Sequence, residues 1–154
     1  MIIDERVSIS DQTTQALYRL VTRWDLLLPK IDPSILELTM KPPQGPVAPG
    51  TVFAERLTMM GRTVEITATI RTLRPPTGYD YEATSEGLNG SGTMTLRDLG
   101  DGSVEFHVHI EMRPTTVGMW FVTTLFACKF RAAERARLAR MKEMLESGTL
   151  VPPA

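Results

Sequence analysis

Four side chains that could bind a metal ion lie close together in the sequence "GSVEFHVHIEM", residues 102–112. Two histidines, His107 and His109, are flanked by Glu105 and Glu111, and all four residues share one parity. Imidazoles and carboxylates are common ligands of zinc and related ions. Residues two apart on a strand point to the same face, so both imidazoles could reach one ion.

The residues between these four favour a different interpretation. They form an unbroken apolar row made of Val104, Phe106, Val108, Ile110 and Met112. A strand with one apolar and one polar face buries the apolar face, so we expect the histidines to face solvent. A cupin-type site adds a more distant glutamate and a third histidine, whereas this chain has two histidines in all. We therefore predict that this strand holds no metal ion.

A carboxylate that could do acid–base chemistry lies in "TVFAERLTMM", residues 51–60. Glu55 shares its parity with Phe53 and Leu57, so it should point toward the core. A buried carboxylate needs a partner or takes a raised pKa, which is how an acid–base catalyst or a ligand anchor is made. The alternative is a β-bulge near the strand end that turns Glu55 toward water.

Three further side chains are candidates for chemistry. Tyr79 and Tyr81 could polarise a substrate carbonyl together with Glu55. Alternatively, both rings pack in the core and send their hydroxyl groups to its rim. Cys128 could be a nucleophile, but it lies in the apolar helical stretch "TLFACKF", where a buried free thiol is more common.

Composition excludes several classes of function. The chain has 154 residues, which favours one domain, and a net charge of −1, which offers no field for nucleic acid. A single cysteine excludes an internal disulfide and fits a reducing compartment. The start of the chain lacks the apolar core of a signal peptide, and the most apolar stretch, residues 117–130, is too short for a bilayer. We therefore expect a cytoplasmic protein without stable membrane insertion or cofactor.

Periodicity predicts a strand, two short helices, six more strands and a long terminal helix. The first strand covers residues 2–9, and a helix follows from a cap at Ser10 or Asp11. A second helical piece should end before Pro29. The remaining strands are predicted at residues 34–40, 51–60, 62–73, 79–86, 92–100 and 103–113.

The last predicted helix begins at Thr115 or Thr116 and runs to about Glu146, with a frayed tail over residues 149–154. Short connections force the strands to pair antiparallel. One apolar sheet face and one long helix remain to cover each other, which predicts a curled sheet around that helix in a single α+β domain, residues 1–148.

Three segments of the sequence resemble those of a known superfamily. They are "PGTVF" at 49–53, "LRPPTGYDYE" at 73–82 and "GSGTMTLRDLGDGSVEFHVHIEM" at 90–112. The chain resembles the START-like (SRPBCC) superfamily, and within it the polyketide cyclase/dehydrase-like bacterial proteins. The resemblance implies a helix-grip fold, in which a seven-stranded antiparallel sheet wraps around a C-terminal helix and two short helices follow the first strand. A cavity between sheet and helix is implied as well.

The residues expected to contact a ligand lie on the inward parity of the strands and on one stripe of the terminal helix. They are Phe53, Leu57, Met59, Ile66, Tyr79, Tyr81, Met94, Phe106, Val108, Ile110, Met119, Val122 and Phe126. The same parity places Leu36, Leu38 and Met40 inward. The alternative is a solid core at crystal-like density. Nine methionines favour an adaptable cavity wall.

Three functions are consistent with the sequence, because the superfamily includes carriers, enzymes and interaction domains. The first is the binding of a hydrophobic small molecule or lipid by a monomer or homodimer. The second is a cyclase/aromatase-type enzyme that uses Glu55 with Tyr79 or Tyr81. The third is a co-chaperone-like interaction module with a filled interior. The cations of residues 129–142 are interpreted as the solvated back of the terminal helix.

Overall fold

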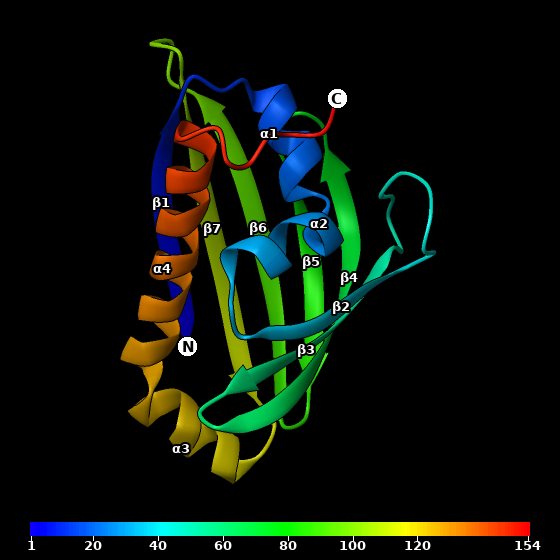
Figure 1. Cartoon of the computed structure of the whole chain (residues 1–154). Coiled ribbons are helices and arrows are strands. Elements are labelled where there is room, and N and C mark those ends of the chain that lie inside the picture. Colours follow the sequence, from blue (N-terminus) through cyan, green and yellow to red (C-terminus); the bar gives the residue numbers. More distant parts are fainter.

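A computed structural model describes residues 1–154 and shows seven strands and four helices (Figure 1). The strands are β1 (Ile2–Ser10), β2 (Ile35–Lys41), β3 (Val52–Met59), β4 (Arg62–Arg74), β5 (Gly78–Ser85), β6 (Leu88–Asp98) and β7 (Ser103–Pro114). The helices are α1 (Thr14–Val21), α2 (Trp24–Ile31), α3 (Val117–Leu125) and α4 (Ala127–Glu146). They confirm the predicted α+β class, with two short helices after the first strand.

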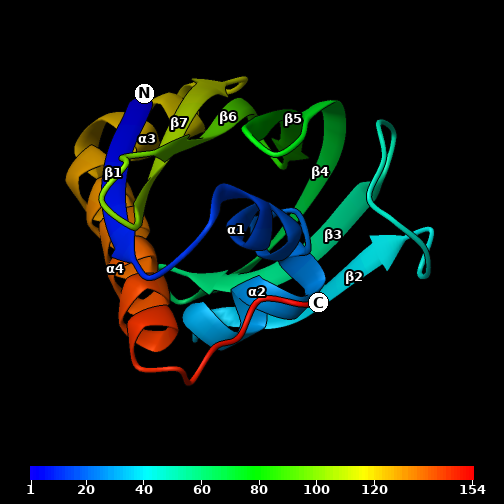
Figure 2. The ribbon, with the colours of Figure 1, turned by 90° about the horizontal axis from the view of Figure 1, so that it is seen from above.

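All seven strands form one antiparallel sheet in the order β1-β7-β6-β5-β4-β3-β2. Tight turns join the strands from β3 to β7. The turn between β3 and β4, for example, has positive φ angles at Met60 (52°) and Gly61 (75°), which suits a two-residue hairpin. Seen from above, the sheet curves around α1 and α2, and α4 lies beside β1 (Figure 2). This is the helix-grip arrangement that the resemblance implied.

The expected inward position of Leu36 is wrong. The pairing of β2 with β3 shifts register between Ile35 and Glu37, and Leu36 is 55% exposed. A bulge adds one residue and reverses the parity that follows. Around Glu55 the pairing is regular, with Leu38 on one side and Ile66 on the other, so the bulge considered there is absent.

The ends of the first two helices also differ from expectation. Asp11 has a φ of 56°, so α1 starts later, with Thr13 as the cap whose hydroxyl accepts from the N–H of Ala16 at 3.1 Å. Helix α2 continues through Pro29 to Ile31. In a short helix this proline removes one backbone bond near the end, and the burial of Leu28 and Ile31 outweighs the loss.

The terminal helix is broken rather than continuous. Phe126, with φ −110° and ψ 14°, separates α3 from α4, and α3 turns away at the end of the molecule (Figure 1). Just before the break, the hydroxyls of Thr123 and Thr124 donate to backbone carbonyls of the preceding turn, a pattern that bends helices. Helix α3 therefore leaves four large apolar side chains exposed, namely Val117, Trp120, Phe121 and Leu125.

Polar contacts attach α4 to the edge strand β1. Arg135 forms an ion pair with Glu5 at 2.8 Å, and Lys142 donates to the carbonyl of Ser8 at 2.6 Å. Arg135 and Lys142 are thus engaged with β1, whereas Arg137 of the same helix is partly buried and pairs with Asp32, so the expected solvated helix back is wrong at Arg137. Beyond the helix, Leu150 is 3% exposed and its N–H donates to the carbonyl of Met144 at 2.9 Å, so the expected fraying of residues 149–154 does not apply at Leu150. None of the helices is both long and apolar enough to cross a membrane.

Candidate functional site

A cavity of about 850 Å³ lies between the inner face of the sheet, α2 and α4. Ligand pockets in proteins commonly measure ~300–1,000 Å³. Its wall consists of 39 residues, of which 26 are hydrophobic, so most of the wall suits an apolar molecule. The interior is therefore not the solid core that the sequence left open.

Most of the residues expected to contact a ligand line this cavity. They are Leu57, Met59, Ile66, Tyr79, Tyr81, Met94, Phe106, Val108 and Ile110. Phe53 lies outside it, because its ring is fully buried and stacks on Trp24 with 5.2 Å between centroids. Met119, Val122 and Phe126 also lie outside, because the break at Phe126 carries α3 away from the sheet interior. Helix α4 instead contributes the wall from Lys129 to Glu143.

Glu55 lies on the cavity wall and is partly buried. Its Oε2 is buried and has no hydrogen-bond partner. Burial raises the pKa of this carboxyl to about 7, against the opposing effect of the positive charge of Arg137. The carboxylates of Asp32 and Glu134 raise it further. Glu55 can therefore both hold and release a proton near neutral pH.

Three charged residues that sequence reasoning missed surround this carboxyl. Arg137 on α4 donates through Nε to Oδ2 of Asp32 at 3.1 Å and through Nη1 to Oε2 of Glu134 at 3.0 Å. Burial raises the pKa of Glu134, whereas hydrogen bonds from Ser34 and the charge of Arg137 outweigh burial and lower that of Asp32. We call Asp32, Glu55, Glu134 and Arg137 the polar cluster.

One sequence signal could have indicated part of this cluster. Glu134 shares helical spacing with Leu138, Met141 and Leu145, and all four are buried on α4. A single glutamate in an otherwise apolar stripe marks an inward carboxylate. The partner Asp32 lies in the connection between α2 and β2, far away in sequence, so only the fold brings it to Arg137.

The two tyrosines have different environments. The hydroxyl of Tyr79 accepts from Nε1 of Trp24 at 2.7 Å and donates to the carbonyl of Val21 at 2.8 Å, so it holds α1 and α2 on the sheet. Tyr81 is 7% exposed, its ring meets Trp24 edge-on at 4.7 Å, and no hydrogen bond occupies its hydroxyl. Burial raises the pKa of both phenols. Only Tyr81 has a hydroxyl free to contact a ligand.

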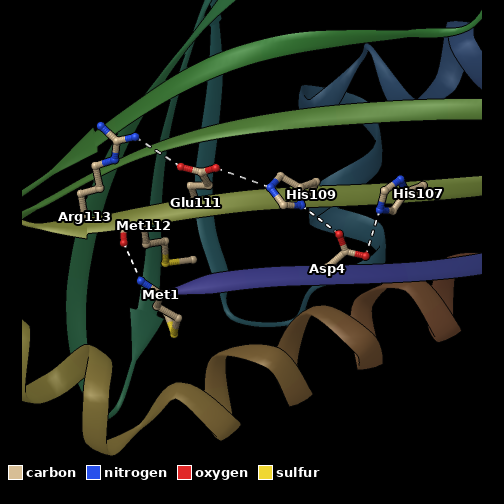
Figure 3. A network of polar contacts seen from close by, with 7 residues as sticks. All are labelled: Met1, Asp4, His107, His109, Glu111, Met112 and Arg113. Carbon is tan, nitrogen blue, oxygen red and sulfur yellow. Dashed lines mark hydrogen bonds and ion pairs between the residues drawn. The ribbon is translucent and has the colours of Figure 1, made fainter.

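The histidines lie on the outer face of the sheet (Figure 3). Nε2 of His107 and Nδ1 of His109 lie 3.0 and 2.9 Å from the two carboxylate oxygens of Asp4 on β1. Hydrogen bonds with His109 and His107 lower the pKa of Asp4, and the bond to Asp4 raises that of His109. No group of three or more such side chains is arranged around a metal position. These contacts join β1 to β7.

The expected burial of Cys128 is wrong, because its side chain is exposed. Cys128 is the second residue of α4, directly after the break at Phe126. The apolar run that suggested a continuous buried helix therefore changes direction just before it.

The fold and this cavity define a class of protein, and comparison with known families agrees. Residues 3–146 match the family model described as polyketide cyclase/dehydrase and lipid transport. The chain belongs to this family, within the START-like (SRPBCC) superfamily. No curated protein matches the chain.

Solved structures share the fold at low identity. TTHA0849 from Thermus thermophilus is 12% identical with a TM-score of 0.74, covering 97% of this chain and 100% of that one. The Zhui aromatase/cyclase from a Streptomyces species is 10% identical with a TM-score of 0.71, covering 94% and 95%. Norcoclaurine synthase from Thalictrum flavum, solved with dopamine and hydroxybenzaldehyde, is 12% identical with a TM-score of 0.65, covering 92% and 85%. Such identities show a common fold and leave the activity of this chain open.

Proposed function

We propose that this protein binds a hydrophobic small molecule or lipid in the cavity between the sheet and α4. The observation that carries the proposal is the cavity itself, about 850 Å³ with 26 hydrophobic residues among the 39 in its wall. Filling such a space with an apolar molecule removes apolar surface from water on both partners. The family description, which includes lipid transport, supports the same proposal. Residence in the cytoplasm and a monomeric or homodimeric state stay predictions.

A variant that fills the cavity tests this proposal. Ala83 on β5 lines the cavity, so Ala83→Phe places a ring inside it. We expect this variant to bind the neutral fluorescent probe N-phenylnaphthylamine roughly tenfold more weakly than the unaltered protein, a loss of about 1.4 kcal/mol. The matched control is Ala132→Phe, because Ala132 is exposed on α4 and outside the cavity wall. Equal binding by both variants, each folded by circular dichroism, would contradict a binding site inside the cavity.

The pKa of Glu55, about 7, favours a second candidate function, an enzyme of the cyclase/aromatase type. A group that holds its proton near neutral pH suits general acid–base catalysis. Tyr81 could act beside it, whereas the hydroxyl of Tyr79 is already engaged. Such an enzyme would convert a polyketide-like substrate into a cyclised product with a different absorbance, with loss of water, and Glu55→Gln would stop that change. The third hypothesis, an interaction module, presupposed a filled interior and gains no support from the cavity.

A further inference from the structure

We infer that the polar cluster is a subsite for the polar end of an amphipathic ligand, and that this end is a hydrogen-bond donor such as a hydroxyl or phenol group. The inference rests on the proposed function and specifies which molecules the cavity prefers. It depends on the balance of donors and acceptors in the cluster and on the apolar wall around it.

Acceptors outnumber donors in the polar cluster. Three carboxyl groups meet one guanidinium, which directs its three hydrogen bonds to Asp32 and Glu134 and none to Glu55. Arg137 directs Nε and Nη2 to Asp32 and Nη1 to Glu134. The second oxygen of Asp32 accepts from the backbone N–H and the hydroxyl of Ser34, at 2.9 and 2.6 Å.

No protein donor reaches Oε2 of Glu55. This oxygen is removed from solvent and has no partner, which is costly for a carboxyl group. Because Glu55 lines the cavity, a rotation of its carboxyl group would bring this oxygen within reach of a donor supplied from inside the cavity. Against the ionised carboxylate, a carbonyl or ether oxygen would bring one more acceptor to a cluster that already has more acceptors than donors.

The remaining wall indicates what the rest of the ligand is. Glu55 lies on the same inner row of β3 as Leu57 and Met59, which also line the cavity. Across the sheet the wall continues with Ile66 on β4, Met94 on β6 and Val108 on β7. A molecule with one polar end at Glu55 and an apolar body along these strands satisfies both parts of the site.

Charge limits the polar end as well. The groups that face Glu55 are Arg137 and Glu134 from α4 and Asp32 from the connection between α2 and β2. Two carboxylates against one guanidinium disfavour a ligand carboxylate or phosphate, by like-charge repulsion in a poorly solvated site. The subsite therefore selects a neutral donor, with an ammonium group as the charged equivalent.

The experiment compares ligands of one shape that differ in the donor. Para-nonylphenol and para-nonylanisole share the same ring and chain, but the methyl ether lacks the O–H. Displacement of bound N-phenylnaphthylamine should give the phenol roughly ten- to a hundredfold higher affinity, because its hydrogen bond reaches a carboxylate. The advantage should be larger at about pH 8.5 than at about pH 5.5, because the ionised carboxylate accepts more strongly. The ether should show no such gain at the higher pH, because it has no donor for the carboxylate.

Variants assign the preference to Glu55. In Glu55→Leu the acceptor is lost, and we expect the phenol and the ether to bind within about threefold of each other. Glu55→Gln keeps a carbonyl acceptor and should retain part of the preference, so it decides the outcome if the leucine variant does not fold. The control Glu65→Gln, at an exposed position on β4, should retain all of it.

The outcomes separate this inference from the proposed function. If neither compound displaces the probe, the binding proposal itself fails. If the unaltered protein binds both equally, the cavity binds apolar molecules but the donor subsite is wrong. A phenol preference that persists in Glu55→Leu, or tighter binding of a ketone of the same length, would also overturn the subsite.

Discussion

Glu55 combines an inward position on β3 with a buried carboxyl oxygen that accepts no hydrogen bond from the protein. Its position followed from strand parity, since Phe53 and Leu57 flank it on the same face. Its chemistry did not follow from the sequence, because the surrounding charges come from α4 and from the α2–β2 connection. Strand parity thus located the carboxyl group, whereas only the fold brings the surrounding charged residues to it.

The raised pKa of Glu55 predicts a dependence of stability on pH. The carboxyl has an ordinary pKa of 4.5, and burial raises it to about 7 in the folded protein. As pH rises through this interval, the unfolded chain loses the proton while the folded protein retains it, so folding becomes less favourable. Below this pH interval Glu55 does not lower the stability of the fold. Above it the loss of stability has reached its full size and stays constant.

Replacement by glutamine should remove this effect. Relative to the unaltered protein, the free energy of unfolding of Glu55→Gln should rise by about 3 kcal/mol as the pH increases from 4.5 to about 7, and then stay level. Urea denaturation at a series of pH values measures it, with Glu65→Gln as the exposed control. A constant difference between variant and parent across that range would show that Glu55 titrates normally in the folded protein.

At the scale of elements, the pairing of β5 with β6 places Tyr81 directly opposite Gly92. A Cβ at Gly92 would lie 2.2 Å from Cε1 of the Tyr81 ring, so the glycine lets this ring lie flat on the neighbouring strand. The ring in turn contacts Trp24 of α2 edge-on and lines the cavity. This one small residue therefore sets where the Tyr81 ring lies in the cavity wall.

Gly92→Ala should destabilise the protein by about 1–3 kcal/mol, because the added methyl group must displace the Tyr81 ring. Urea denaturation measures this loss, and the fluorescence of Trp24 should change with it. Gly118→Ala is the matched control, because Gly118 lies in α3 with nothing within 4 Å of its Cβ position. If Gly92→Ala were as stable as this control, the close packing of Tyr81 on β6 would be contradicted.

The individual elements also show where sequence patterns predict the structure correctly and where they do not. The alternation of β7 predicted which side chains face inward and placed His107 and His109 outside, because this strand pairs regularly on both sides. In β2 the same rule misplaced Leu36, because a bulge reverses parity without a distinct sequence signal. Hydrophobicity alone likewise predicted one continuous terminal helix, although its threonines bend the chain before Phe126.

At the scale of the whole molecule, the sequence was sufficient for the architecture. Turn signals and period-two strands imply an antiparallel sheet with one apolar face, and the terminal helix is the element that remains to cover it. The cavity follows less directly, because a sheet and helix of the same pattern can also close on a solid core. Its volume depends on how α4 rests on β1 and on the Arg137–Asp32 contact, which joins α4 to the α2–β2 connection.

Native mass spectrometry of the freshly purified protein tests the central claim most directly. The claim is that the space between sheet and α4 exists to hold an apolar molecule with a donor group at one end. We predict a population heavier than the bare chain, which loses a neutral, extractable amphipathic molecule on denaturation and which is depleted in Ala83→Phe. A bare chain in every preparation, together with no uptake of para-nonylphenol added at high concentration, would contradict the account.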